Sequence, residues 1–323
     1  MSSRAHGPLW CATFVVLDAA QAVLFGSFLQ RMDSFLIGFL VFGLSSLGCL
    51  VAVLWRVPHE LQTARAMPGL LAMLNVSSAA GWLAYLGAIQ LIEPAVAFTV
   101  FSGVIPLAVV AARAWTPAQT PLHGWERTGL AVLALGLVAL AVTTLAGLSG
   151  FVRGGGAVAA AGLLFSVLSG VAMSGMLLAS YRLSARGVSP TAVFALRFPL
   201  YLLLAAGGYL LGLDDKGSLP PADLLAAVAV GLAVLAFPIY AVQKAVSLTS
   251  ALTLGAATAL IPVVVLVMQM AEGRVDYSQA TAVGLAIYTA GALLAAAGRA
   301  RAESRRKPHR PFLDVSGSRP PPG

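Results

Sequence analysis

Charged residues are scarce in this chain: Asp, Glu, Lys and Arg make up 10% of its 323 residues, against about 25% in a typical soluble domain. Hydrophobic residues make up 59%, and the mean hydropathy is +0.89. A water-soluble fold of this size needs far more polar surface than this composition supplies. The scarcity of charge therefore excludes an ordinary soluble domain and indicates a membrane protein.

Residues that bind metals or carry out acid–base catalysis are also scarce. The two cysteines, Cys11 and Cys49, both fall in apolar segments, where we expect small buried side chains rather than a disulfide or metal ligands. No HExxH motif or Walker A loop occurs, and the glycines at 154–156 lack the strand–helix context of a phosphate loop. The histidines lie outside the apolar segments, at His6, His59, His123 and His309. The sequence therefore predicts no metal, no cofactor and no enzyme.

Long apolar stretches are what the chain does contain. Ten of them approach or exceed the roughly 20 helical residues that a bilayer crossing needs, and Pro, Gly and charged clusters separate them. They are rich in Leu, Ala, Val and Gly without the polar–apolar alternation of a β-barrel strand. We therefore predict an all-α polytopic membrane protein of ten transmembrane helices. The expected spans are 8–29, 34–55, 68–91, 95–115, 127–148, 156–180, 190–212, 222–245, 249–271 and 277–298.

The basic residues predict how these spans are oriented, because loops rich in Lys and Arg stay in the cytoplasm. With the N-terminus inside, 15 basic residues fall on the cytoplasmic side and 4 on the other. This predicts a plasma-membrane protein with both termini in the cytoplasm, and the Ala, Gly, Leu and Arg bias suggests a bacterial source. The net charge of +8 follows from this topology and the basic tail, so we expect no nucleic-acid partner.

The ten spans divide into two halves of five around the Gly-rich stretch 147–156. We predict one repeat over residues 1–150, a second over 151–298, and a basic, Pro-rich, disordered cytoplasmic tail over 299–323. An odd number of spans in each half inserts the second half upside down relative to the first.

Local sequence supports this internal repeat. Residues Gly87–Gln90, near the end of the third span, resemble Tyr240–Gln243, near the end of the eighth. Similarly, Val104–Pro106 in the fourth span resembles Leu260–Pro262 in the ninth. Inverted repeats of this kind are typical of secondary transporters, which bind substrate between the repeats near the middle of the bilayer.

The arrangement of the spans, together with segments in both halves of the chain, resembles a known family. The segments that carry the resemblance are residues 88–97, 102–107, 189–198 and 259–263. Together with ten spans in two inverted halves, they are similar to the EamA-like branch of the drug/metabolite transporter superfamily. Arg197-Phe198 matches an Arg-Phe pair that this family has in the second helix of a repeat, whereas the first half has no arginine between Asp33 and Leu44. The resemblance implies a transporter fold and favours export.

Two charged residues, Asp18 and Arg197, lie clearly within the expected spans rather than close to their ends. Charged groups are costly in hydrocarbon, so each is a candidate for a functional role. Asp18 lies about halfway along the first span, and Gln21, three residues on, shares its helix face. Asp18 could exchange a proton during transport or could join helices as a structural group. Arg197 could pair with Asp18, bind an anionic substrate or extend its side chain toward the interface.

The third span carries the clearest polar stripe. Asn75, Ser78, Trp82 and Tyr85 fall at i, i+3, i+7 and i+10, on one helix face. Their amide, hydroxyl, indole and phenol groups suit a cavity for a small amphiphilic molecule, although polar contacts between helices would use the same residue types. Ser102 belongs to a weaker stripe in the fourth span, and the matching repeat segment adds Tyr240 and Gln243 as further candidates.

These observations favour a secondary active transporter that exports a small organic metabolite by alternating access, with proton coupling through Asp18 as the mechanism to test. An accessory membrane scaffold and an intramembrane enzyme are the alternatives. The expected partners are a small-molecule substrate and the lipid bilayer, and the sequence leaves a homodimer open.

Overall fold

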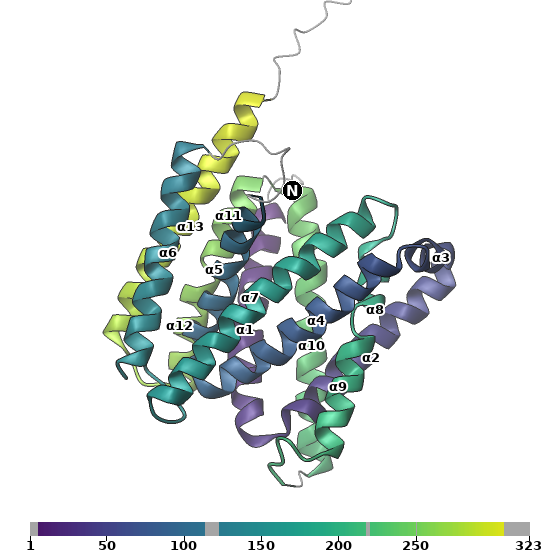
Figure 1. The fold of residues 1–323 in the computed structure, drawn as a ribbon, viewed down its shortest axis with the longest axis horizontal. Coiled ribbons are helices and arrows are strands. Elements are labelled where there is room, and N and C mark those ends of the chain that lie inside the picture. The colour runs from purple at the N-terminus through teal and green to yellow at the C-terminus, as the bar shows by residue number, and fades with distance from the viewer. Residues whose placement is uncertain (1–5, 114–122, 218–219, 250, 307–323) are drawn as a thin grey trace, which may run out of the picture.

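The protein is a bundle of helices. The computed structural model describes residues 6–113, 123–217, 220–249 and 251–306, and every regular element in these ranges is a helix (Figure 1). The helices are α1 (His6–Arg31), α2 (Ser34–Arg56), α3 (His59–Arg65), α4 (Pro68–Leu91), α5 (Pro94–Arg113), α6 (Gly124–Leu145), α7 (Gly156–Ser184), α8 (Pro190–Leu196), α9 (Pro199–Leu210), α10 (Pro221–Leu248), α11 (Ala251–Ala259), α12 (Ile261–Glu272) and α13 (Gln279–Arg306).

Nine candidate membrane spans occur within the described residues. Two of them join consecutive helices, α8 with α9 over Pro190–Leu210 and α11 with α12 over Thr253–Glu272. Helix α10 covers the remaining predicted span, and its described apolar part, Pro221–Val234, is shorter. The prediction of an all-helical, multi-pass membrane protein is confirmed by these nine candidate spans.

The outer surface of the bundle is apolar. Large hydrophobic side chains are exposed on several helices, such as Trp55 on α2, Leu135 and Val142 on α6, and Leu210 on α9, with Trp55 89% and Leu210 82% exposed. A soluble monomer rarely exposes so much contiguous apolar area. This surface is therefore suited to lipid.

Two spans are interrupted where the sequence predicts continuous helices. The seventh span breaks at Arg197 and Phe198, and α9 restarts with Pro199 in its first turn. The ninth span breaks at Leu260, and Pro262 occupies the first turn of α12. Proline is tolerated there because the first backbone N–H groups of a helix have no intrahelical partner. By contrast, Pro106 lies inside the continuous helix α5.

Part of the segment predicted as a disordered tail is helical. Helix α13 continues through residues 299–306 to Arg306, so these residues are helical rather than disordered. The rest of the predicted tail, 307–323, lies outside the described residues. Helix α3, in the loop between the second and third spans, was not predicted either.

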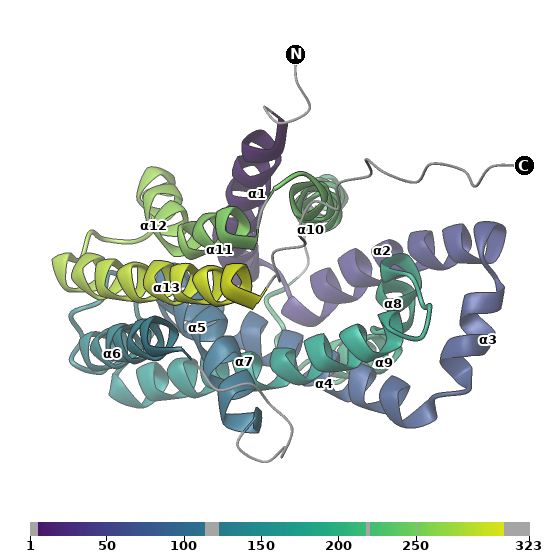
Figure 2. The same cartoon turned by 90° about the horizontal axis from the view of Figure 1, so that it is seen from above.

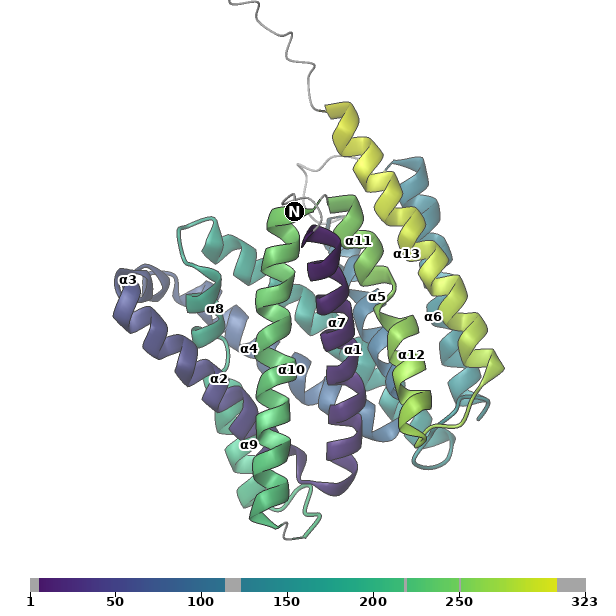
Figure 3. The same cartoon turned by 180° about the vertical axis from the view of Figure 1, so that it is seen from behind.

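The helices pack in extended pairs. Helix α4 lies along α7 and α1 lies along α10, while α6 and α13 run side by side at one edge of the bundle (Figures 1 and 3). Helices α2, α8 and α9 form the opposite edge (Figure 2). The start of α1 and the end of α13 lie at the same end of the bundle, which we call the terminal end (Figure 3).

Glycines at seven-residue spacing allow α6 and α13 to approach closely. They are Gly129 and Gly136 on α6, and Gly284, Gly291 and Gly298 on α13. A Cβ at Gly291 would lie 2.3 Å from the backbone nitrogen of Leu133, closer than any real Cβ contact. Small residues at such spacing let membrane helices pack backbone to backbone.

Candidate functional site

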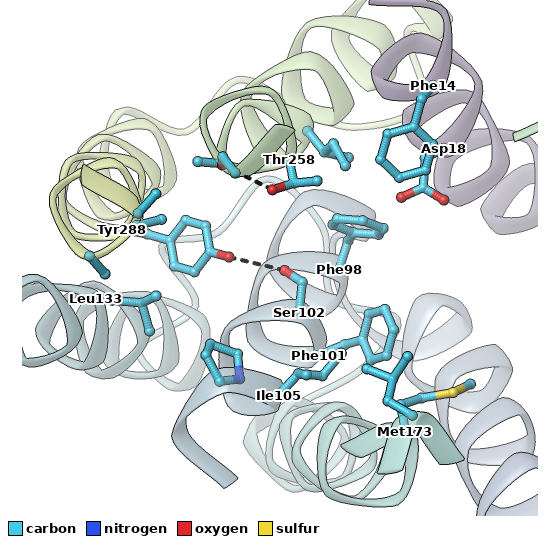
Figure 4. A pocket seen from close by; sticks show the side chains of 18 of the residues that line it. Phe14, Asp18, Phe98, Phe101, Ser102, Ile105, Leu133, Met173, Thr258 and Tyr288 are labelled. Carbon is cyan, nitrogen blue, oxygen red and sulfur yellow. Dashed lines mark hydrogen bonds between the residues drawn. The ribbon is translucent and has the colours of Figure 1, made fainter. Parts of the chain in front are cut away.

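A cavity of about 630 Å³ lies inside the bundle, lined by residues from both halves of the chain. Figure 4 shows side chains from α1, α5, α6, α7, α11 and α13 pointing toward it. Six of the ten residues that the sequence predicted for the site line this cavity: Asp18, Gln21, Trp82, Tyr85, Ser102 and Arg197. The cavity is within the roughly 300–1,000 Å³ range of small-molecule sites.

Helix α1 contributes the carboxyl group of the cavity. The Asp18 side chain points from α1 toward Phe98 of α5 (Figure 4). Gln21 lines the same cavity one turn further along and is 7% exposed. Across the residues that the structure describes, Asp18 has neither an ion pair nor a hydrogen bond from its side chain. Asp18 therefore presents an uncompensated carboxyl to the cavity.

The break between α8 and α9 positions the guanidinium group of the cavity. The Arg197 Cζ lies 4.4 Å from the centroid of the Phe194 ring and 4.6 Å from that of Phe198. Its Nη1 lies 3.9 Å from the Met176 sulfur, and its Nε is buried without a hydrogen bond. Among the described side chains no carboxylate forms an ion pair with Arg197. Aromatic rings therefore orient this cation without neutralising it.

The sequence left open whether Asp18 and Arg197 pair with each other, and in the structure they do not. Both nevertheless line the same cavity. The site therefore holds a potential anion, Asp18, and an unpaired cation, Arg197, that remain separate.

Aromatic side chains form much of the wall. The Trp82 and Tyr85 rings lie 5.9 Å apart on α4, and Tyr85 lies 5.0 Å from Phe101 of α5. Phe98 contacts Phe101 with centroids 5.8 Å apart, in an edge-on arrangement. Such aromatic contacts are individually worth about 0.5–1.5 kcal/mol beyond area burial. They give the cavity an apolar wall beside Asp18 and Arg197.

The other two residues of the predicted α4 stripe lie elsewhere. Asn75 donates through Nδ2 to the carbonyl oxygens of Leu71 at 3.0 Å and Leu196 at 2.9 Å, and its Oδ1 accepts from the Leu200 N–H at 3.3 Å. It therefore satisfies backbone groups on both sides of the α8–α9 break. Ser78 is fully buried, and its hydroxyl has no hydrogen bond. Neither residue lines the cavity.

Two predicted residues, Tyr240 and Gln243, lie on α10, but their side chains are outside the described part of the structure. Three polar residues line the cavity that the sequence analysis did not identify. They are Thr258 on α11 and Tyr288 and Arg299 on α13. The Tyr288 and Ser102 hydroxyl oxygens lie 3.2 Å apart (Figure 4). Tyr288 and Arg299 are eleven residues apart, close to three helical turns, so they lie on one side of α13. This spacing is a pattern from which the sequence could have predicted that both face the cavity.

The cavity extends toward the terminal end of the bundle. Its lining reaches Arg299, near the end of α13. The Arg299 Nη2 lies 3.3 Å from the carboxylate of Glu126, at the start of α6. No lining residue comes from the loops at the opposite end. There, hydrogen bonds join segments of both halves.

Glu93 is the centre of one of these hydrogen-bonded groups. This fully buried carboxylate accepts from the Gly150 N–H at 2.9 Å, from the Thr281 hydroxyl at 2.9 Å and from the Gln269 side-chain amide. The Gln269 Oε1 in turn accepts from the Ala95 N–H at 3.0 Å. Burial raises the pKa of the Glu93 carboxyl, and its hydrogen bonds oppose that increase. Glu93 thus ties the α4–α5 corner to α12, α13 and the loop before α7.

A second group at the same end involves the loop after α9. Lys216 pairs with Asp214 and donates to the Gln90 Oε1 at 2.9 Å. Asp214 accepts from the Ser34 N–H at 2.9 Å, at the start of α2. Burial raises the pKa of Asp214, but its bonds with Lys216 and Ser34 outweigh burial and lower it overall. These contacts connect α2, α4 and the α9–α10 loop.

Comparison with known proteins supports the fold only. No family model matches the chain, and no curated protein matches it. A solved structure described as "Crystal structure of protein" is similar over 93% of this chain and 99% of its own, with a TM-score of 0.60 and 23% sequence identity. The similarity shows that the arrangement of helices occurs in another protein.

Proposed function

We propose that this protein is a secondary transporter that exports a small organic metabolite by alternating access, as the resemblance to the EamA-like transporters suggests. The observation that carries the proposal is the internal cavity, in which Asp18 and Arg197 are uncompensated while the walls are apolar. Ionisable groups facing a water-accessible cavity within membrane spans are typical of substrate and ion pathways.

The packing of helices supports two inverted halves of five spans. If each helix is matched with the one five spans later, α1 corresponds to α7 and α4 corresponds to α10. The pairs α4–α7 and α1–α10 then become equivalent, as observed, and α6–α13 is its own equivalent. A broken helix at Arg197 and another at Leu260 also fit transporters, whose sites use discontinuous helices.

The two ends of the bundle differ in a way that fits one state of an alternating-access cycle. The cavity reaches the terminal end, and the Glu93 and Lys216 groups join the helices at the opposite end. With both termini in the cytoplasm of a bacterial cell, as the basic residues indicate, this state is open to the inside. Opening the other side requires breaking these hydrogen bonds.

The proposal is tested by flux into proteoliposomes of a panel of radiolabelled metabolites, with and without a pH gradient. We expect uptake of at least one compound by the wild type, stimulated by the gradient. Asp18→Asn should lose the stimulation while still exchanging substrate across the membrane without a gradient. Absence of flux for every compound that binds would instead favour an accessory protein, and product formation would indicate an enzyme.

A further inference from the structure

The break between α8 and α9 is not explained by its proline alone. Pro106 and Pro238 lie inside the continuous helices α5 and α10. A proline removes one donor from the helical ladder, and for Pro199 the acceptor left over is the Ala195 carbonyl. The Ser46 hydroxyl of α2 donates to that carbonyl at 2.8 Å. A second feature must therefore separate α8 from α9.

The side chain of Asn75 is that feature. In a continuous helix the Leu200 N–H would donate to the carbonyl of Leu196, four residues earlier. Here the Asn75 Nδ2 donates to the Leu196 carbonyl at 2.9 Å, and its Oδ1 accepts from the Leu200 N–H at 3.3 Å. Asn75 belongs to α4, which together with α2 packs against the broken span (Figure 2). A side chain inserted into the ladder in this way interrupts a helix.

The break also determines what supports the guanidinium of Arg197. Its Cζ lies 4.4 Å from the ring centroid of Phe194 and 4.6 Å from that of Phe198, and the two centroids are 5.2 Å apart. Phe194 belongs to α8, whereas Phe198 immediately precedes α9. Because one ring lies toward each helix, the angle between α8 and α9 sets the spacing of the two rings.

We propose that Asn75 is a positioning residue for Arg197. By holding the Leu196 carbonyl and the Leu200 N–H apart, its amide keeps the two phenyl rings together beside the guanidinium and so directs Arg197 into the cavity. Loss of the amide would return Leu200 to Leu196 as its acceptor, join α8 and α9 into one helix and separate the rings. The inference rests on the proposed function only for the use of Arg197 in transport, because its placement is measurable without a substrate.

Chemical modification of Arg197 tests this placement. Phenylglyoxal adds to the guanidinium of arginine, and mass spectrometry of the purified full-length protein in detergent gives the rate at each arginine. The rate at Arg197 is divided by the rate at Arg299, which lines the same cavity from α13. Asn75→Leu and Asn75→Ala should each raise this ratio about fivefold, the scale of one lost cation–π contact, because a guanidinium that leaves the rings is less shielded. An unchanged or lower ratio in both variants would overturn the inference.

A matched control separates positioning from a general loss of stability. Ser46→Ala removes a hydrogen bond at the same break. Its acceptor, the Ala195 carbonyl, has no ladder donor whether α8 and α9 are joined or separate, because Pro199 lacks an N–H. The ratio should therefore keep its wild-type value. An increase in Ser46→Ala equal to that in Asn75→Leu would contradict the role given to the Asn75 amide.

A double variant tests whether Asn75 acts through the rings. Phe198→Leu removes one ring directly and should raise the ratio by itself. Addition of Asn75→Leu should then cause no further increase, since both changes dismantle the same support. Independent effects multiply, so a double variant whose increase equals the product of the two single increases would refute the assignment. Each ratio compares two arginines in one sample, so protein concentration does not affect it.

Flux is a separate measurement, so the two proposals fail separately. If these ratios are observed and no compound of the metabolite panel is transported, Asn75 positions Arg197 and the transporter proposal fails. If a compound is transported and the ratios do not change, the transporter proposal stands and the positioning role is refuted.

Discussion

Replacing Glu93 is expected to destabilise the protein more than any other single change at the end of the bundle away from the termini. Its carboxylate accepts hydrogen bonds from Gly150, Thr281 and Gln269 while fully buried. Glu93→Ala leaves the buried donors of Thr281 and Gln269 and the part-buried Gly150 N–H without an acceptor. Unsatisfied buried donors cost about 1–3 kcal/mol each, so we expect a total loss of about 3–5 kcal/mol. At about 2–4 °C per kcal/mol, the apparent melting temperature should fall by roughly 10 °C.

Glu93→Gln separates the hydrogen bonds from the charge. The glutamine oxygen can still accept from Gly150 and Thr281, but its NH₂ group then faces the Gln269 amide. Gln269 could rotate to present its oxygen there, but would then no longer accept from Ala95. One donor remains unsatisfied in either case, so we expect a loss of about 1–2 kcal/mol. Glu272→Gln, at a partly exposed glutamate, is the matched control and should cost under about 1 kcal/mol.

The pH dependence of stability gives an independent test of the same residue. Burial holds the pKa of Glu93 above its ordinary value of 4.5, so the folded protein binds this proton more tightly than the unfolded chain does. The stability from this effect is complete below that ordinary value and is lost as pH rises through the folded-state pKa. The stability of wild type relative to Glu93→Gln should therefore be greatest at acidic pH.

Melting temperatures of wild type, both Glu93 variants and the control, measured in detergent between acidic and neutral pH, check these expectations. A constant difference between wild type and Glu93→Gln across this range would refute the titration argument. A melting temperature of Glu93→Ala equal to that of the wild type would refute the structural role of the hydrogen-bonded group.

Three further substitutions test other parts of the structure. Asn75→Ala should reduce the free energy of unfolding by about 2–3 kcal/mol, and so lower the melting temperature, because the bonds across the α8–α9 break are lost. An unchanged melting temperature would contradict that role. Gly291→Ala should lower the melting temperature because the new Cβ would meet the α6 backbone, whereas Gly48→Ala, where nothing lies within 4 Å, should not. Equal melting temperatures for the two variants would argue against the close α6–α13 packing. Asp214→Asn should be less stable than the wild type at neutral pH, and this difference should disappear as pH falls through the lowered pKa of Asp214. Melting temperatures at neutral and acidic pH check this, and a difference that persists at acidic pH would contradict the Lys216 pairing.

The spans could be predicted from the sequence because lipid imposes a strict rule. A backbone that faces lipid must satisfy its own hydrogen bonds, so a crossing is apolar and almost wholly helical, and a break is tolerated only where protein buries it. The breaks at Arg197 and Leu260 were not predicted, since a proline in an apolar run is compatible with a kink, a restart or neither. Pro106 stays inside α5 and Pro262 begins α12, although their local sequences are similar.

The site was only partly predictable for a related reason. Asp18, Trp82 and Tyr85 were found because polar and aromatic groups within a span form a visible pattern. Asn75 belongs to the same stripe, yet its partners are backbone groups of α8 and α9, 121 and 125 residues away. Glu93 was overlooked because it lies between two spans, where a charged residue is expected to face water, whereas α12 and α13 bury it completely.

The asymmetry of the two ends bears on the resting state of the proposed transporter. If the halves are equivalent, the α4–α5 corner at Glu93 corresponds to the corner between α10 and α11, where Thr249 lies. Thr249 bonds to its own helix through the Ala245 carbonyl, and its oxygen lies 3.8 Å from the Cys11 sulfur of α1. A hydroxyl–thiol contact is far weaker than three bonds to a carboxylate. Among the described residues, the corner between α10 and α11 therefore has no hydrogen-bonded carboxylate like Glu93. If that corner closes the terminal end in the other state of the proposed cycle, this difference favours the state that is open at the terminal end.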